Sequence, residues 1–250
     1  MHPNLTKQVV DFTRAAPPIR AACLDDLFTF SSGMFENETR EGFEKMLTAE
    51  GLRDARILFF RDGDGRVRGY NMVRRFAPIV DGRPVDLFRA VAAMAPEYRG
   101  GGSTLGFGMM LAVKRKLRHP LRPCYYIGAL VHPSSYYLFA KNAAEIWPRH
   151  DRETPPDIRA LIAKLSETTG IDITDATHPF VTFDGVPTRQ DAGEAGFWRD
   201  HPRPEVQLFL KLNPRYSEGY GLVTLVPLTW KNLAVGAFRA ATAGLRRRRN

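Results

Sequence analysis

The sequence has little cysteine and no long apolar run. Two of its 250 residues are cysteines, Cys23 and Cys124, and they lie far outside the short spacings of zinc sites and redox motifs. We therefore expect two reduced thiols in a protein core. No run approaches the ~20 apolar residues that a membrane-spanning helix needs, and the first residues, MHPNLTK, lack the pattern of a signal peptide. These absences favour a cytoplasmic protein.

Several chemical motifs are missing as well. The six histidines are scattered, with no pair three or four residues apart, so we expect no metal site. No lysine occurs between Lys45 and Lys114, which excludes a Gly-Lys-Ser/Thr phosphate-binding loop at the glycines in between. The sequence also contains no Gly-x-Ser-x-Gly nucleophile elbow.

Positive charge is in excess. Lysine and arginine number 36 against 27 aspartates and glutamates, which gives a formal net charge of +9. Such an excess favours an anionic partner, although a solvated basic surface would have the same composition. The basic residues are not interleaved with aromatic ones into a recognisable module, so we expect no nucleic-acid partner.

The first half of the chain has the pattern of an antiparallel meander. Residues 56–61 predict a strand, which a turn at 62–65 joins to a second strand over 67–76. A turn at 81–83 leads to a third strand over 85–94. Apolar residues at helical spacing predict a helix over 103–118, and a buried strand over 124–131 and a helix over 134–147 follow.

The segment between the third strand and the helix over 103–118 is the most informative. It reads Met94-Ala-Pro-Glu-Tyr-Arg-Gly-Gly-Gly-Ser-Thr104. The first N–H groups of a helix have no partner within it, glycine lets an anion approach the backbone, and the helix dipole favours negative charge. The segment is therefore a candidate phosphate-binding cradle, with a simple tight turn as the alternative. The candidate ligand-binding residues are Met94, Arg99, Gly100, Gly101, Gly102, Ser103 and Thr104.

This segment resembles the acetyl-CoA-binding motif of the GNAT superfamily of N-acyltransferases, Val-x-Pro-Glu-Tyr-Arg-Gly-x-Gly-x-Gly/Ala. Arg99 and Gly102 fall on the conserved pair, whereas Thr104 replaces the final small residue. The resemblance covers residues 20–148 and implies the GNAT fold, an α/β (α+β) fold with a central mixed, mostly antiparallel, twisted sheet flanked by helices. It also implies acyl-CoA, or acyl-phosphopantetheine on an acyl carrier protein, as the acyl donor.

The resemblance implies that an amine attacks the thioester directly, which calls for a base. Many GNAT proteins place a glutamate on the strand before the cradle, and Asp86 is the only carboxylate on that strand here. His132, which ends the next strand, is better placed and has an unperturbed pKa near neutrality. A histidine before proline also suits a helix cap or a turn.

The sequence offers several candidates for the acid that would protonate the leaving thiolate. The resemblance places a tyrosine in the following helix, and Phe139 occupies that position. Tyr136, Tyr137 and Ser135 are the remaining candidates, with core packing as the alternative for both tyrosines. The missing tyrosine keeps open a second function, a catalytically weak protein that binds or senses acyl-CoA.

The second half predicts a helix over 157–166, an irregular stretch over 171–205 and a hairpin of strands over 206–212 and 220–228. We interpret the chain as one domain, residues 1–250, with a core at about 20–148, a helical insertion at about 150–205 and a final hairpin at 206–228. An amphipathic helix over 229–250 ends in Arg246–Arg249. It favours docking on a carrier protein or peripheral contact with an anionic membrane, with packing on the protein's own sheet as the alternative.

Together these features predict an N-acyltransferase that moves an acyl group to a primary amine of a small molecule or peptide. Large apolar residues near the expected thioester, among them Phe88, Met94 and Phe107, favour a medium or long acyl chain. Each buried methylene contributes ~0.8 kcal/mol to such a preference. Ordinary core packing is the alternative explanation for these residues.

Overall fold

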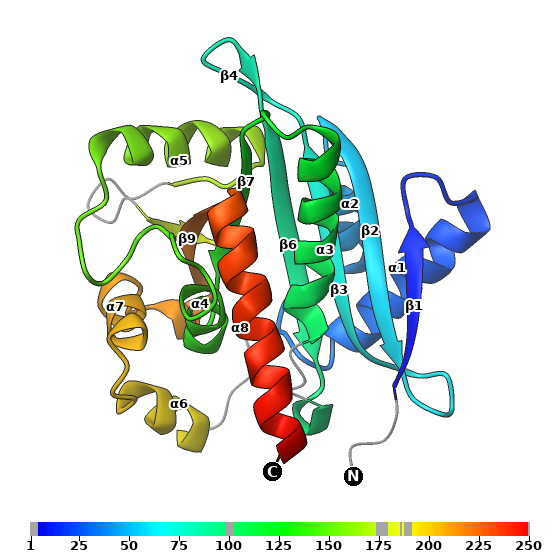
Figure 1. Ribbon diagram of the computed structural model, residues 1–250. Helices are drawn as coiled ribbons and strands as arrows, with labels where there is room; N and C mark the ends of the chain where they lie inside the picture. Colours follow the sequence, from blue (N-terminus) through cyan, green and yellow to red (C-terminus); the bar gives the residue numbers. More distant parts are fainter. Residues whose placement is uncertain (1–4, 99–102, 174–179, 186, 188–191, 250) are drawn as a thin grey trace. The chain divides into compact units, whose positions relative to one another are not determined.

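The computed structural model describes residues 5–98, 103–173, 180–185, 187 and 192–249. The chain divides into two compact units, residues 1–122 and 123–250, and Figure 1 follows the chain through them. Each unit combines antiparallel strands with helices, which confirms the expected fold class. The interpretation as one domain stays a prediction.

Unit 1 contains an antiparallel sheet in the order β1-β2-β3-β6. Its strands are β1 (Thr6–Asp11), β2 (Leu52–Arg61), β3 (Val67–Phe76) and β6 (Asp86–Met94). The meander expected over residues 56–94 is confirmed, with β2 starting earlier than predicted. Strand β1 lies at the edge of this order, and its mostly exposed, polar residues leave only a weak strand pattern in the sequence.

Two tight turns join these strands. Between β2 and β3 the Asp62 carboxylate accepts the backbone N–H groups of Asp64 and Arg66 at 3.0 and 2.9 Å. Gly65 has a φ of 79° there, in the left-handed region that glycine adopts without strain. Between β3 and β6, a short hairpin of β4 (Ile79–Val80) and β5 (Arg83–Pro84) turns at residues 81 and 82, both at positive φ. Both expected turns are confirmed.

Helices pack on both faces of the unit 1 sheet (Figure 1). Helices α1 (Pro17–Ser31) and α2 (Arg40–Leu47) form a hydrophobic core with one face, which includes Met72. The neighbouring Val73 points to the other face because strand residues alternate. There a Cβ on Gly108 of α3 (Ser103–Arg118) would lie 3.9 Å from Val73. Helix α3 matches the predicted helix in both bounds.

Cys23 and Cys124 are both buried thiols outside any disulfide, as expected. Burial raises the pKa of the Cys23 thiol to about 12, with a smaller upward contribution from Asp26. The reactive thiolate is therefore not populated near neutral pH. Cys23 is a core residue.

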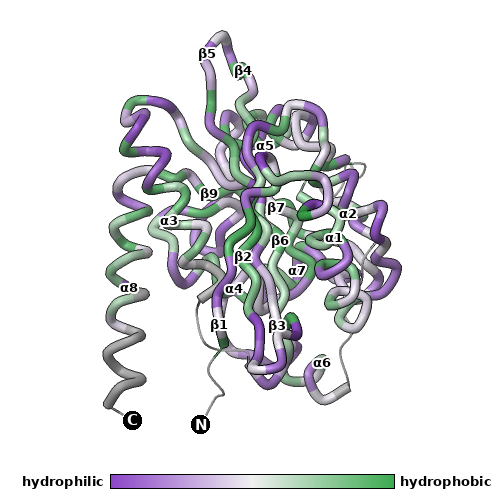
Figure 2. Tube along the Cα trace, turned by 90° about the vertical axis from the view of Figure 1, so that its right-hand side faces the viewer, coloured by the Kyte–Doolittle hydropathy of each residue, from purple (hydrophilic) through white to green (hydrophobic). Residues whose placement is uncertain are grey.

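Unit 2 contains an antiparallel sheet of β7 (Cys124–Leu130), β9 (Tyr220–Pro227) and β8 (Val181–Phe183), in that order. Its helices are α4 (Pro133–Ala140), α5 (Pro156–Thr168), α6 (Ala192–Arg199), α7 (Pro204–Leu212) and α8 (Trp230–Arg249). The strand predicted over 124–131 and the helices predicted over 157–166 and 229–250 are confirmed. Figure 2 shows hydrophobic residues along the interior strands of both units.

The final hairpin predicted over 206–228 is wrong in its first half, because residues 204–212 form helix α7. The run Val206–Leu212 alternates like a strand, but Val206 and Phe209 also have helical spacing, and both are fully buried. Phe209 packs against Tyr136 of α4, with ring centroids 6.0 Å apart. The sequence fits a strand and a helix periodicity equally well, and this packing favours the helix. Strand β9 pairs with β7 and β8 instead.

The helix predicted over 134–147 is also wrong in its second half, since α4 ends at Ala140. Beyond it, Trp147 exchanges backbone hydrogen bonds of 2.9 and 2.8 Å with Leu225 of β9. The buried side-chain amide of Asn232 holds the intervening chain through hydrogen bonds of 2.6–2.8 Å to the backbone of Ala144, Glu145 and Pro227. A buried amide with all its groups paired outweighs local helix propensity. The stretch predicted as irregular over 171–205 contains β8 and α6.

Helix α8 spans 20 residues and leaves Trp230 and Phe238 exposed by 46% and 70%. Arg239 ties it to the end of α4, because its guanidinium donates to the Lys141 carbonyl oxygen at 2.6 Å. Over the described ranges of the chain, no helix combines the length and the apolar character needed to cross a membrane.

Candidate functional site

The strand before the candidate cradle ends in a tightly packed corner. Met94 lies opposite Gly69 in the β3–β6 register. A Cβ on Gly69 would lie 2.6 Å from Met94 Sδ and 2.9 Å from the Ala93 carbonyl oxygen, so only glycine fits there. The Ala95 N–H then donates to the Arg68 carbonyl oxygen at 2.9 Å, and a 3₁₀ turn, η1 (Pro96–Tyr98), follows. The candidate cradle therefore begins at a fixed point at the end of β6.

The central residues of the cradle motif, Arg99, Gly100, Gly101 and Gly102, lie outside the described residues, so their binding role stays a prediction. Ser103 and Thr104 are the first two residues of α3. The last turn of this helix contains the basic residues Arg115, Lys116 and Arg118, which suit the negative end of the helix dipole. The structure thus supplies a strand end on one side of the glycines and a helix start on the other, the two flanks that an anion cradle needs.

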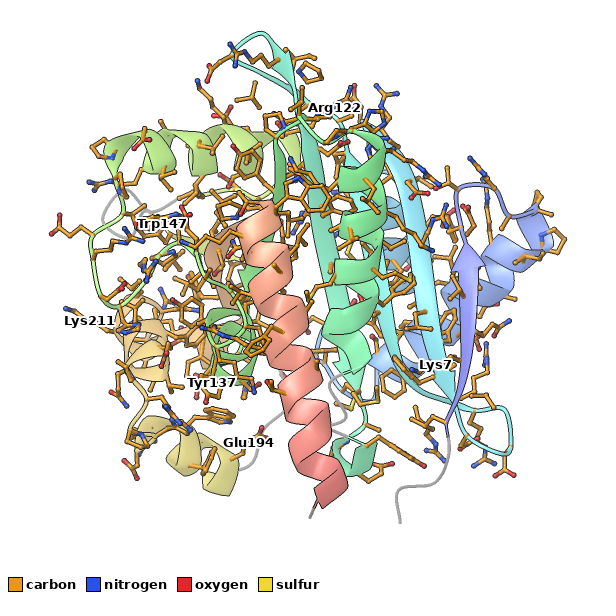
Figure 3. The ribbon with its side chains drawn as sticks, in the orientation of Figure 1. Lys7, Arg122, Tyr137, Trp147, Glu194 and Lys211 are labelled. Carbon is orange, nitrogen blue, oxygen red and sulfur yellow. The ribbon has the colours of Figure 1, made fainter. Side chains whose placement is uncertain are left out.

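Asp86, the second candidate base, lies at the other end of β6 as the centre of a buried ion cluster. Asp86 is 1% exposed. The guanidinium groups of Arg115, Arg75 and Arg122 lie 2.8, 3.2 and 3.8 Å from it. Figure 3 labels Arg122 just beyond the C-terminal end of α3. Burial, followed by repulsion from Arg115, lowers the pKa of Arg75.

This environment argues against Asp86 as a base. Arg75 and Arg115 donate hydrogen bonds to its two oxygens, and Arg122 lies 3.8 Å away, so the carboxylate is occupied within the protein. The cluster has a structural consequence instead, because Arg75 belongs to β3, Arg115 to α3 and Asp86 to β6. It fixes the C-terminal part of α3 against two strands of the sheet.

His132, the first candidate base, caps helix α4. Its Nδ1 accepts the backbone N–H of Ser134 at 3.2 Å and lies 2.6 Å from Ser134 Oγ. A ring nitrogen that accepts an N–H must present a lone pair, so we infer that the neutral imidazole carries its proton on Nε2. The Ser134 hydroxyl then donates its hydrogen to Nδ1. The cap role that the sequence left as an alternative is confirmed.

The Nε2 side of His132 faces helix α6, on which Figure 3 labels Glu194. Glu194 Oε1 lies 3.7 Å from Nε2. The rings of Trp198 and Tyr216 stand edge-on to the imidazole, with centroids 5.7 and 6.0 Å away. Hydroxyl, imidazole and carboxylate thus form a row, Ser134–His132–Glu194, of the kind that can move a proton.

Sequence reasoning missed both outer members of this row. From the sequence we name Ser135 and not its neighbour Ser134, although a His-Pro-Ser sequence at a helix start is itself a signal for a capped serine. Glu194 lies far along the chain in a stretch predicted to be irregular, where no motif distinguishes it. Only the packing of α6 brings it to His132.

The three proton-donor candidates on α4 lie in different surroundings. Tyr136 is fully buried and donates to the Pro148 carbonyl oxygen at 2.8 Å. Burial raises the pKa of its phenol, and the core-packing alternative describes it better. Tyr137, labelled in Figure 3, is half-buried, with its ring 5.0 Å from Lys141 Nζ. Ser135 is also half-buried, so Tyr137 and Ser135 stay candidates.

A further phenol lies beside Phe139, the residue that replaces the expected tyrosine. The Phe139 ring stacks on Tyr126 of β7, with centroids 4.6 Å apart and 15° between the planes. Tyr126 lies over Gly128, where a Cβ would be 2.4 Å from the Tyr126 hydroxyl oxygen. Strand alternation puts both residues on one face, and this i, i+2 pair is the signal that could have pointed to Tyr126.

Metal ligands do not gather in the part of the chain that the structure describes. There, no group of three or more histidine, cysteine, aspartate or glutamate side chains could hold an ion. The expectation of a metal-free site stays a prediction.

Comparison with known proteins gives matches among solved structures alone. No protein-family model and no curated protein matches the chain. Arabidopsis thaliana NAA60 in complex with acetyl-CoA is 12% identical, with 57% of this chain and 87% of that chain covered and a TM-score of 0.39. The aminoglycoside antibiotic 6'-N-acetyltransferase AAC(6')-Ih from Acinetobacter baumannii is 13% identical, with coverage of 61% and 95% and a TM-score of 0.38.

A third similar structure is the GNAT family N-acetyltransferase YhbS from Escherichia coli in complex with CoA. It is 13% identical, with 93% of this chain and 87% of that chain covered and a TM-score of 0.37. YhbS belongs to the GNAT family, whose acetyl-CoA-binding motif the cradle segment resembles. At TM-scores below 0.5 and identities below 25%, the likeness establishes neither activity nor ligand for this chain.

The buried hydroxyl of Tyr136 predicts a stability effect without a functional one. Tyr136→Phe leaves the Pro148 carbonyl oxygen without its donor and should lower the free energy of unfolding by about 1 kcal/mol. Urea denaturation measures this loss, and Tyr137→Phe on the same helix is the matched control, expected within ~0.5 kcal/mol of wild type. Equal stability of the two variants would contradict the assignment of Tyr136 to the core.

Proposed function

We propose that the chain is an N-acyltransferase that moves an acyl group from coenzyme A to a primary amine. The observation that carries the proposal is the end of β6 at the Gly69–Met94 corner, followed by the glycine-rich motif and the start of α3. Backbone N–H groups at a helix start favour a pyrophosphate, and glycines allow it to approach. Acyl-CoA would supply an activated thioester, which leaves positioning and proton transfer to the protein.

Deprotonation of the amine is the most demanding task. An amine with a pKa near 10.4 is neutral at pH 7 in about one molecule in 2500, a cost of about 4.6 kcal/mol. In our proposal the amine gives its proton to Ser134 Oγ as Ser134 gives its own to His132 Nδ1. Glu194 would then stabilise the imidazolium from the Nε2 side. The 2.6 Å Oγ–Nδ1 and 3.7 Å Nε2–Oε1 distances support a proton path along this row.

For protonation of the leaving thiolate we propose Tyr126. Its support is the stacking on Phe139, which puts a phenol next to the position where the superfamily pattern has one. Tyr137 and Ser135 are the remaining candidates from the sequence.

Three finer features are also parts of the proposal. They are a medium or long acyl chain, an acyl carrier protein as an alternative donor, and contact of helix α8 with an anionic membrane. The exposed Trp230 and Phe238 of α8, together with its arginine-rich end, support an anionic surface as the partner of that helix. Phe59, Phe60 and Phe76 are fully packed in the core of unit 1. They therefore give no support to a long acyl channel. Phe88 and Phe107 are buried as well, so the channel depends on Met94, which is partly exposed.

A protein that binds acyl-CoA without turnover is the second candidate function. The observation that favours it is Phe139, which has no proton to give and is held in a stack. The two functions share the coenzyme site and differ only in proton transfer.

Thiol release distinguishes the two functions. We expect the protein to release free thiol from acyl-CoAs, tested from acetyl to palmitoyl, only when a primary amine is present. A thiol reagent can report this because Cys23 and Cys124 are both buried and add little background. Coenzyme binding without release across the panel would favour the sensor, and absence of both would remove both functions.

Substitution of His132 separates its cap role from its proton role. Asparagine is a good N-cap, so His132→Asn should keep α4 folded yet lower kcat by about 10²-fold, because the imidazole is lost. His132→Ala should lose the same turnover and, in addition, about 1 kcal/mol of stability. Steady-state kinetics and urea denaturation measure the two effects. Full turnover by the asparagine variant would refute the proton relay.

A further inference from the structure

Unit 1 contains a pocket of about 550 Å³ between the C-terminal half of α1 and the turn that joins β2 to β3. This volume lies within the ~300–1,000 Å³ typical of small-molecule sites. One part of its lining is apolar, formed by Phe30, Met34 and Val67. The other part carries charge, chiefly from Asp26, Arg61, Arg66 and Arg68.

Two of these arginines are already used within the protein. Arg61 forms a short ion pair with Asp26 and donates to the Gly65 carbonyl oxygen at 3.0 Å. Arg68 donates to the Asp62 carboxylate at 2.6 Å, and this hydrogen bond raises the pKa of Arg68. Their charges are therefore neutralised by carboxylates of the same unit.

Arg66 differs from the other two. It lies exposed in the turn, with its backbone N–H held by the Asp62 carboxylate at 2.9 Å. Within the described residues its guanidinium forms no ion pair. The pocket thus combines an apolar wall with one guanidinium that is not neutralised, which is the chemistry that binds a carboxylate attached to an apolar body.

The pocket also lies at the end of the sheet where the candidate cradle begins. Val67 and Arg68 line it, and the Arg68 carbonyl oxygen accepts the Ala95 N–H at 2.9 Å. Ala95 directly follows β6 and precedes η1 and the glycines. A molecule in the pocket would therefore lie beside the segment assigned to the coenzyme.

We infer that this pocket binds the acceptor, and that the acceptor is a primary amine that also carries a carboxylate and an apolar body, as apolar amino acids do. Arg66 binds the carboxylate, and Phe30, Met34 and Val67 contact the apolar part. The inference rests on the proposed function for the acceptor's amine, whereas recognition of the carboxylate depends on the pocket alone.

Two amines that differ in the carboxylate provide the test. Thiol release from acetyl-CoA is measured with L-phenylalanine and with phenethylamine, and we expect kcat/KM to be about tenfold higher for L-phenylalanine, the contribution of one charge-assisted pair. Arg66→Gln should remove this advantage and leave phenethylamine unaffected. Arg53→Gln is the matched control, since Arg53 is also exposed but lies near the start of β2, at the opposite end of that strand from the turn that contains Arg66.

Calorimetric titration of both amines without coenzyme separates this inference from the proposed function. If L-phenylalanine binds in an Arg66-dependent way but no amine releases thiol, carboxylate recognition stands and the transferase proposal fails. If both amines are acylated equally, or Arg66→Gln behaves like Arg53→Gln, the transferase stands and the inference is overturned. If L-phenylalanine neither binds nor is acylated, the inference is overturned as well.

Discussion

The carboxylate of Asp86 connects strands β6 and β3 and helix α3 through ion pairs. It is almost fully buried against Arg75, Arg115 and Arg122, and leaving such a cluster without one partner typically costs ~3–5 kcal/mol. Helix α3 is therefore held at its C-terminal part, on a sheet whose β6 ends at the Gly69–Met94 corner. Strand end and helix start together fix the two ends of the glycine-rich motif. The proposed coenzyme site depends on this constraint. The pocket adjoins the other end of β6, because Arg68 in its wall accepts the Ala95 N–H.

In unit 2, the proposed proton transfer depends on a local constraint of a different kind. His132 is held by the first turn of the helix it caps, so its Nδ1 is committed to Ser134 and its Nε2 to the side of Glu194. This fixed tautomer favours proton transfer through the serine hydroxyl over direct abstraction by the ring. The helix cap and the proposed proton transfer thus both use the lone pair of His132 Nδ1. A substitution at His132 has to preserve the cap if it is to test the proton transfer alone.

Local signals predicted the meander and α3 well because their information lies in adjacent residues, such as the Asp62–Gly65 turn and the apolar spacing over 103–118. Prediction failed where distant packing decides. Residues 206–212 fit both a strand and a helix periodicity, and the packing of Phe209 on Tyr136 favours the helix. The residues after Ala140 are not helical, because Asn232, far along the chain, accepts hydrogen bonds from their backbone. Asp86 could not be recognised as the centre of an ion cluster, because Arg115 lies in the following helix and Arg122 lies beyond that helix. Glu194 carries no local signal for the same reason.

The central claim is that the start of α3 binds coenzyme A, and a calorimetric titration of coenzyme A into the full chain tests it most directly. The account predicts saturable binding at one site per chain for the wild type, with no detectable heat for Gly102→Val, because a branched side chain blocks the approach of a pyrophosphate to the backbone. Circular dichroism should show that the variant is folded. Absence of binding by the wild type, or equal binding by a folded Gly102→Val, would contradict the account.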